Sequence, residues 1–170
     1  LRKAGANARI RNVPVPGGGF ELDVVDSEIA PVIYATQSVE PRLVVFGSEL
    51  PIRRPVYFNT PDDLLTLNAR ASDPNLSVYR RIPGTGRYSE TFHVPPRVDE
   101  LLRVLGAEAV ADRAGRVAGL GFTYGEVVRL TQEMCAARVI EAKFVLQEPP
   151  ALRRIYQDAT TSDRPDITGQ

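Results

Sequence analysis

The chain has very few of the residues on which metal binding and nucleophilic catalysis most often depend. Its 170 residues include one cysteine, Cys135, and one histidine, His93. A lone cysteine excludes an intramolecular disulfide and a cysteine-based metal site, and one histidine beside it cannot complete a conventional zinc site. We therefore expect no metal site and no cofactor.

An excess of charge of one sign is also lacking. The 21 basic residues balance 21 acidic residues, and Lys3 and Lys143 are the only lysines. Because no long run of like charge appears, the sequence offers no basic surface of the kind that binds nucleic acid or an anionic membrane. We therefore expect a protein partner or self-association, and no nucleic acid.

Long apolar runs are absent as well. No stretch approaches the roughly 18 to 20 apolar residues that span a bilayer, and no succession of charged, apolar and small residues marks a signal peptide. We expect no membrane span. Because the chain begins with Leu1 and not with methionine, we expect a processed protein or a fragment, and the compartment stays open on these grounds.

What the chain does contain is the composition of a globular protein, with 43% hydrophobic and 25% charged residues. Its best-specified stretch is 120–147. Thr123 followed three residues later by Glu126 is a capping box, and Val127, Leu130 and Met134 then recur at helical spacing. From residue 140 to 147 apolar and polar residues alternate, so a half-buried strand is expected after the helix.

The first half of the chain is expected to form strands separated by turns. Residues 9–15 predict an edge strand, Gly17 to Gly19 a hairpin turn, and residues 20–24 the returning strand. A phosphate-binding loop would need a helix after the glycines, and a strand pattern follows instead. The contiguous apolar run at 42–46 predicts burial on both faces of its sheet. Further strands are expected at 32–36, 55–59, 64–70, 76–81 and 88–94.

The second half begins with a short amphipathic helix at 98–105, after Pro95-Pro96; residues 107–119 are either a frayed helix or a loop. Together the patterns predict an α+β fold, β-rich, with a mostly antiparallel sheet or small sandwich and two or three short helices. We expect three parts. Residues 1–30 comprise a helix end at 1–7 and a β-hairpin, and can belong to a preceding domain. Residues 31–147 form the β-rich α+β domain. Residues 148–170 form a polar C-terminal tail.

Catalysis has few candidates in this chain. His93 ends a predicted strand and would act as a general base only if Asp99 or Glu100 held it, which nothing in the spacing requires. Cys135 falls on the apolar face of the predicted helix, where a packing thiol is expected in place of a nucleophile. The acidic pairs are Asp62-Asp63, Asp99-Glu100 and Asp23/Asp26, and all are expected to be solvated and structural, since acidic residues in the first turn of a helix favour its dipole whatever their function. We expect no catalytic residue and no enzyme activity.

The hairpin around residues 83–86 is the strongest local candidate for binding. The cationic and aromatic residues that flank its turn are Arg80, Arg81, Arg87, Tyr79 and Tyr88. Cations beside aromatic rings can hold a glycan, a single-stranded nucleic acid or a carboxylate of a partner chain. Exposed arginines can equally serve only to keep a surface soluble.

Three stretches also carry a family resemblance. They are PRLVVFGSELPIRRPVYFN at 41–59, VYRRIPGTGRYSETFHVPPRVDELLRVLG at 78–106 and GFTYGEVVRLTQEMCAARVIEAKFVLQ at 121–147. Together they resemble the extra C-terminal region of flagellar basal-body P-ring proteins of planctomycete-type bacteria. The resemblance implies a non-enzymatic, secreted or periplasmic component of the bacterial flagellum basal body, with ring-forming neighbours and the cell wall as candidate partners. The chain lacks the ring-forming body of those proteins, and no functional residue carries over.

These observations favour the hypothesis that the chain is a non-enzymatic structural or protein-interaction domain. It would be part of an assembly such as a flagellar basal-body ring, in the periplasm or secreted. The alternative is a ligand-binding or regulatory module that recognises an anionic glycan or peptide through the arginine-rich hairpin. A third hypothesis is a hydrolase that uses His93 with a neighbouring carboxylate.

Overall fold

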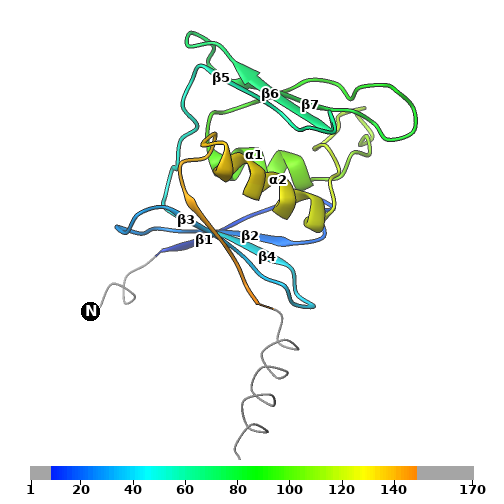
Figure 1. The fold of residues 1–170 in the computed structure, drawn as a ribbon. Coiled ribbons are helices and arrows are strands. Elements are labelled where there is room, and N and C mark those ends of the chain that lie inside the picture. The colour runs from blue at the N-terminus through cyan, green and yellow to red at the C-terminus, as the bar shows by residue number, and fades with distance from the viewer. Residues whose placement is uncertain (1–8, 149–170) are drawn as a thin grey trace, which may run out of the picture.

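The computed structural model describes residues 9–148, which form three layers (Figure 1). A five-stranded sheet and a four-stranded sheet lie on opposite sides of two helices, α1 (Val98–Gly106) and α2 (Tyr124–Ala136). The expected α+β fold is confirmed. The two sheets do not face each other directly, however, because the helices form the middle layer.

The five-stranded sheet joins strands from both ends of the described chain, in the spatial order β1-β2-β4-β3-β9. These strands are β1 (Ile10–Val13), β2 (Glu21–Val25), β4 (Arg42–Phe46), β3 (Val32–Ala35) and β9 (Lys143–Leu146). The pairs β1–β2 and β3–β4 are antiparallel, whereas β2–β4 and β3–β9 are parallel. Since β1 and β2 share a sheet with β9, the boundary expected near residue 30 does not separate two sheets.

The register divides this sheet into a buried face and an outer face. Leu22 pairs with Leu43, and Val45 pairs with Ile33, so these residues share the face that packs on the helices, where each is at most 1% exposed. The intervening residues Val44 and Phe46 of β4 lie on the opposite face and are only partly buried. The expectation that the run at 42–46 is buried on both faces is therefore wrong.

The four-stranded sheet is an antiparallel meander in the order β5-β6-β7-β8. Its strands are β5 (Val56–Asn59), β6 (Leu65–Ala69), β7 (Leu76–Arg80) and β8 (Phe92–Val94). The strand expected at 88–94 is shorter and begins only at Phe92. Before it, Ser89 donates one backbone hydrogen bond to Arg80, and Tyr88 forms an isolated bridge with Arg81. β8 is an edge strand of this sheet.

Local sequence explains the two helices. The capping box of α2 is formed: the Thr123 amide donates to the Glu126 carboxylate at 2.8 Å, and the Glu126 amide donates to the Thr123 hydroxyl at 3.3 Å. α1 follows the two prolines, and its Leu101 and Leu105 are fully buried. Neither helix of the described part is long and apolar enough to cross a membrane.

Residues 107–120 form a loop, which settles the alternative left open for that segment. The loop includes an isolated bridge between Ala111 and Val117 and runs back along α1. Gly119 passes so close to α1 that a Cβ atom there would lie 2.4 Å from the carbonyl oxygen of Val104. The helix end expected at 1–7, and the tail expected at 148–170 apart from its first residue, lie outside the described residues.

Candidate functional site

The structure does not bring the five hairpin residues to one site. Tyr79 and Tyr88 form an edge-to-face pair, with ring centroids 5.7 Å apart. The Tyr88 hydroxyl donates to the Asp63 carboxylate at 3.0 Å, and this hydrogen bond raises the pKa of Tyr88. Arg81 and Arg87 are exposed beside this pair. Arg80 faces the other way.

Arg80 points from β7 toward the helix layer. It follows Leu76 and Val78 at every second position of the strand, and both of those residues are fully buried. The Arg80 guanidinium lies 4.0 Å from the centroid of the Phe122 ring, and its Nη1 donates to the Leu120 carbonyl at 2.8 Å. Burial, the largest influence, lowers the pKa of Arg80.

A groove of about 480 Å³ opens at Arg80, between the hairpin and the loop 107–120. We call it the Arg80 groove. Its walls are mainly apolar, and its lining residues are Arg80, Ile82, Pro83, Ser89, Glu90, Phe92, Ala109, Val117, Gly119 and Leu120. Sequence patterns missed the groove because it joins segments far apart in the chain. The alternation of Arg80 with buried residues of β7 was the one available signal.

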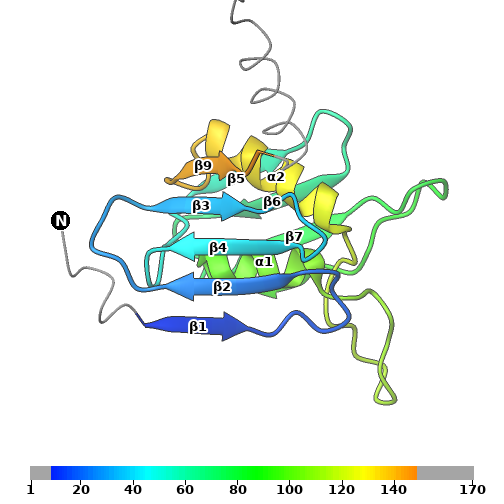
Figure 2. The same ribbon diagram turned by 90° about the horizontal axis from the view of Figure 1, so that it is seen from below.

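The outer face of the five-stranded sheet is a second candidate surface. By register its apolar and aromatic residues are Val25, Val32, Tyr34, Val44, Phe46 and Val145, which we call the outer sheet face; Asp23 of β2 lies beside Val44 on the same side. All six are partly buried, and none is among the partly buried residues that pack on the core. Figure 2 shows this face in front, with the helices behind it.

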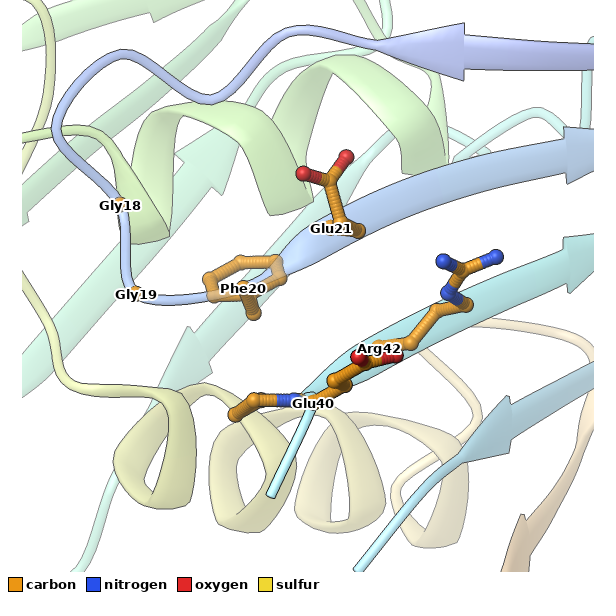
Figure 3. A pocket seen from close by; sticks show the side chains of 7 residues that line it. Gly18, Gly19, Phe20, Glu21, Glu40 and Arg42 are labelled. Atoms are coloured by element: carbon orange, nitrogen blue, oxygen red, sulfur yellow. The ribbon is translucent and has the colours of Figure 1, made fainter. Parts of the chain in front are cut away.

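A third, shallower hollow of about 420 Å³ lies where β2 and β4 begin, beside the glycines of the 17–19 turn (Figure 3). Glu21 and Arg42 are register neighbours there. Arg42 Nη1 lies 3.1 Å from the carboxylate of Asp23, which is only 8% exposed, so the expectation of a solvated Asp23 is wrong. Glu21 accepts a hydrogen bond from Asn12 at 2.8 Å. As expected, a strand and not a helix follows the glycines.

The residues considered for catalysis are not assembled. His93 is exposed on β8, while Asp99 pairs with Arg11 and Arg97, and Glu100 pairs with Arg103. Cys135 is half-buried against the core, and burial raises the pKa of its thiol to about 11, so it stays protonated at neutral pH. Within residues 9–148, no three His, Cys, Asp or Glu side chains cluster in a way that could hold a metal ion.

Comparison of the chain with protein-family models, with curated proteins and with solved structures finds no match.

Proposed function

We propose that this chain is a non-catalytic protein-interaction domain of a larger assembly, and that it docks through the outer sheet face. The observation that carries the proposal is the apolar character of that face. A sheet that meets water on one side normally alternates apolar residues inside with polar residues outside. Here Val44 of β4, Tyr34 of β3 and their neighbours Phe46, Val32 and Val145 are apolar or aromatic, and only the β2 side of Val44 carries a charged residue, Asp23.

Three charged residues of the same face stand at its margins, whereas the fourth, Asp23, lies beside Val44 and is paired with Arg42. Glu21 and Arg42 occupy the beginning of β2 and β4, and Lys143 begins the edge strand β9. An apolar centre with a polar rim is the usual anatomy of a protein–protein interface. Contiguous apolar patches on a surface are typical of such sites.

The partner that the chain itself supplies is a second copy. Five strands spaced by roughly 4.8 Å, each rising about 3.3 Å per residue, give a flat area of about 300 Å². A stable interface usually buries about 800 Å² on each partner. Two isolated copies would therefore associate weakly, and several contacts acting together in an assembly would be needed for stable binding.

The resemblance to the C-terminal region of flagellar P-ring proteins supports the same proposal from a separate direction. Such a region would lie in a secreted or periplasmic ring of the flagellar basal body, where each copy meets identical neighbours. In a ring the outer sheet face would have to contact a different surface of the neighbouring copy, because a face that docks on itself closes a dimer.

Light scattering and sedimentation on the full chain test the proposal. We expect concentration-dependent association that weakens at least tenfold in Val44→Glu, because a carboxylate at the centre of the face would be desolvated without a partner. Ser77→Glu, at a central position on the outer face of the four-stranded sheet, is the matched control and should associate like the wild type. Each variant is first checked for unchanged thermal unfolding.

Two results would contradict docking of a second copy. One is a wild-type chain that stays monomeric at about 1 mM, where a contact worth only about 4 kcal/mol would be half formed. The other is an equal effect of Val44→Glu and Ser77→Glu, which would show that added charge acts without regard to the face.

A further inference from the structure

The Arg80 groove contains a cation without a direct ion-pair partner, although the more distant charge of Glu126 acts to raise its pKa. No carboxylate of residues 9–148 lies within salt-bridge distance of Arg80. Its Nε is closed off from solvent without a hydrogen-bond partner, while Nη1 donates to Leu120. Nη2 is neither bonded to a described residue nor closed off, so it is the donor that remains for a ligand.

An unpaired, partly desolvated cation costs free energy that a bound anion would offset. The Phe122 ring and the Leu120 carbonyl hold the guanidinium in one place, so a ligand would not have to order it. Around it the apolar walls formed by Ile82, Phe92 and Leu120 would accept an apolar group. The complementary ligand therefore carries a carboxylate next to an apolar side chain. Glu90 also lines the groove, so a ligand with more than one negative charge is disfavoured.

The edge of β8 adds a backbone component. The Arg80 carbonyl accepts from the Ser89 amide, so alternate residues of β7, including Val78, direct their backbone groups toward β8. Phe92 is the register partner of Val78. The alternation along an antiparallel strand then directs the N–H and C=O groups of Thr91 and His93 away from β7. No described backbone group bonds these free groups.

We propose that the Arg80 groove binds an extended segment of a partner protein, which pairs with the free edge of β8 and places a carboxylate on Arg80. Side chains two positions apart in an extended segment lie on the same side. The segment therefore carries Asp or Glu at one position and an apolar residue two positions away, both directed into the groove. Addition of a strand to an exposed sheet edge is a common mode of peptide recognition.

This inference shares with the proposed function only the premise that the chain binds protein. The groove and the outer sheet face are separate surfaces, so Val44→Glu should leave peptide binding unchanged and a groove variant should leave self-association unchanged. Failure of one proposal is therefore distinguishable from failure of the other.

The probe is a set of three acetylated and amidated nonapeptides, Thr-Val-Thr-Asp-Thr-Leu-Thr-Val-Thr and its analogues with Phe or Val in place of Leu. Each is titrated into the full chain and followed by amide NMR shifts. We expect binding with shifts at Thr91 and His93, and about tenfold weaker binding of the matched peptide with Asn in place of Asp, because a charge-assisted hydrogen bond is lost.

Two variants test the role of Arg80. In Arg80→Met the preference for the Asp peptide over the Asn peptide should disappear, whereas Arg81→Met, the exposed neighbour that alternation along the chain directs to the other face, should keep it. Ile82→Glu changes a residue that is 39% exposed on the groove wall. It should abolish binding without affecting folding, which covers the case in which Arg80→Met does not fold.

Four results with the peptides would overturn the proposal. They are the absence of binding by all three Asp peptides at about 1 mM, equal binding of Asp and Asn peptides, equal effects of the Arg80 and Arg81 variants, and shifts that leave Thr91 and His93 unmoved. Octanoate serves as a competitor of the peptide. If it displaces the peptide and binds as tightly, the site recognises a small amphiphilic carboxylate and the peptide proposal is wrong.

Discussion

At the scale of single residues, Asp99 forms an ion pair that its neighbours in the sequence do not predict. The position of Asp99 and Glu100 in the first turn of a helix suggested a solvated pair. Glu100 is indeed partly exposed, but Asp99 is only 4% exposed, and its carboxylate lies 2.7 Å from Arg97 and 2.8 Å from Arg11. Arg11 lies on β1, far away in the sequence, so only the folded chain could reveal this contact.

This network predicts a pH-dependent contribution to stability. Burial raises the pKa of Asp99, but hydrogen bonds from Arg97 and Arg11 and the charge of Arg97 outweigh it, and the pKa is lowered. A lowered pKa in the folded state stabilises the protein above the unfolded-state value of about 3.9 and loses this effect as the pH falls through the folded-state value.

We expect Asp99→Asn to reduce the free energy of unfolding at pH 7 by about 1–3 kcal/mol. The gap to the wild type should narrow as the pH falls below about 4. Urea unfolding at several pH values measures both effects. Glu100→Gln, in the same helical turn, should cost less than about 1 kcal/mol. Equal losses in the two variants, or a gap that does not change with pH, would contradict the buried ion pair.

At the scale of elements, α2 is the part that the sequence specified best, and its cap can be tested alone. Thr123→Ala removes the acceptor for the Glu126 amide and should cost about 0.5–2 kcal/mol in thermal or urea unfolding. Thr123→Ser keeps the hydroxyl and should recover most of the loss. Because the two side chains of the box act together, Thr123→Ala combined with Glu126→Ala should cost less than the sum of the single changes. Strict additivity would mean that the reciprocal bonds contribute nothing.

The strands show where element-level prediction ends. Their positions followed from alternation and turns, since those are local properties. The element that packs on each face of a strand is not a local property. The apolar run at 42–46 suggested burial on both faces, yet the helices cover only one. Similarly, the arginines of the hairpin looked alike in sequence, but the strand alternation placed Arg80 in the groove and left Arg81 exposed.

At the scale of the whole molecule, the pairing of distant segments lay beyond sequence patterns. The parallel pairs β2–β4 and β3–β9 join segments whose spacing in the chain carries no signal. The three-layer arrangement follows from them, because α1 contacts β2 of one sheet and β8 of the other. One continuous cluster of buried residues runs through both sheets and both helices.

A shared core predicts that the two sheets unfold together. Leu67 is fully buried on β6, in the four-stranded sheet, and Leu67→Ala should lower the free energy of unfolding by about 2–5 kcal/mol. Because the core is continuous, the slowest-exchanging amides of β4, in the other sheet, should lose the same free energy of protection. Native-state hydrogen exchange measures this, with Asn68→Ala, the next residue of β6 and only partly buried, as the matched control. If β4 kept its full protection in Leu67→Ala, the sheets would be independent units, and docking through one would leave the other free to open.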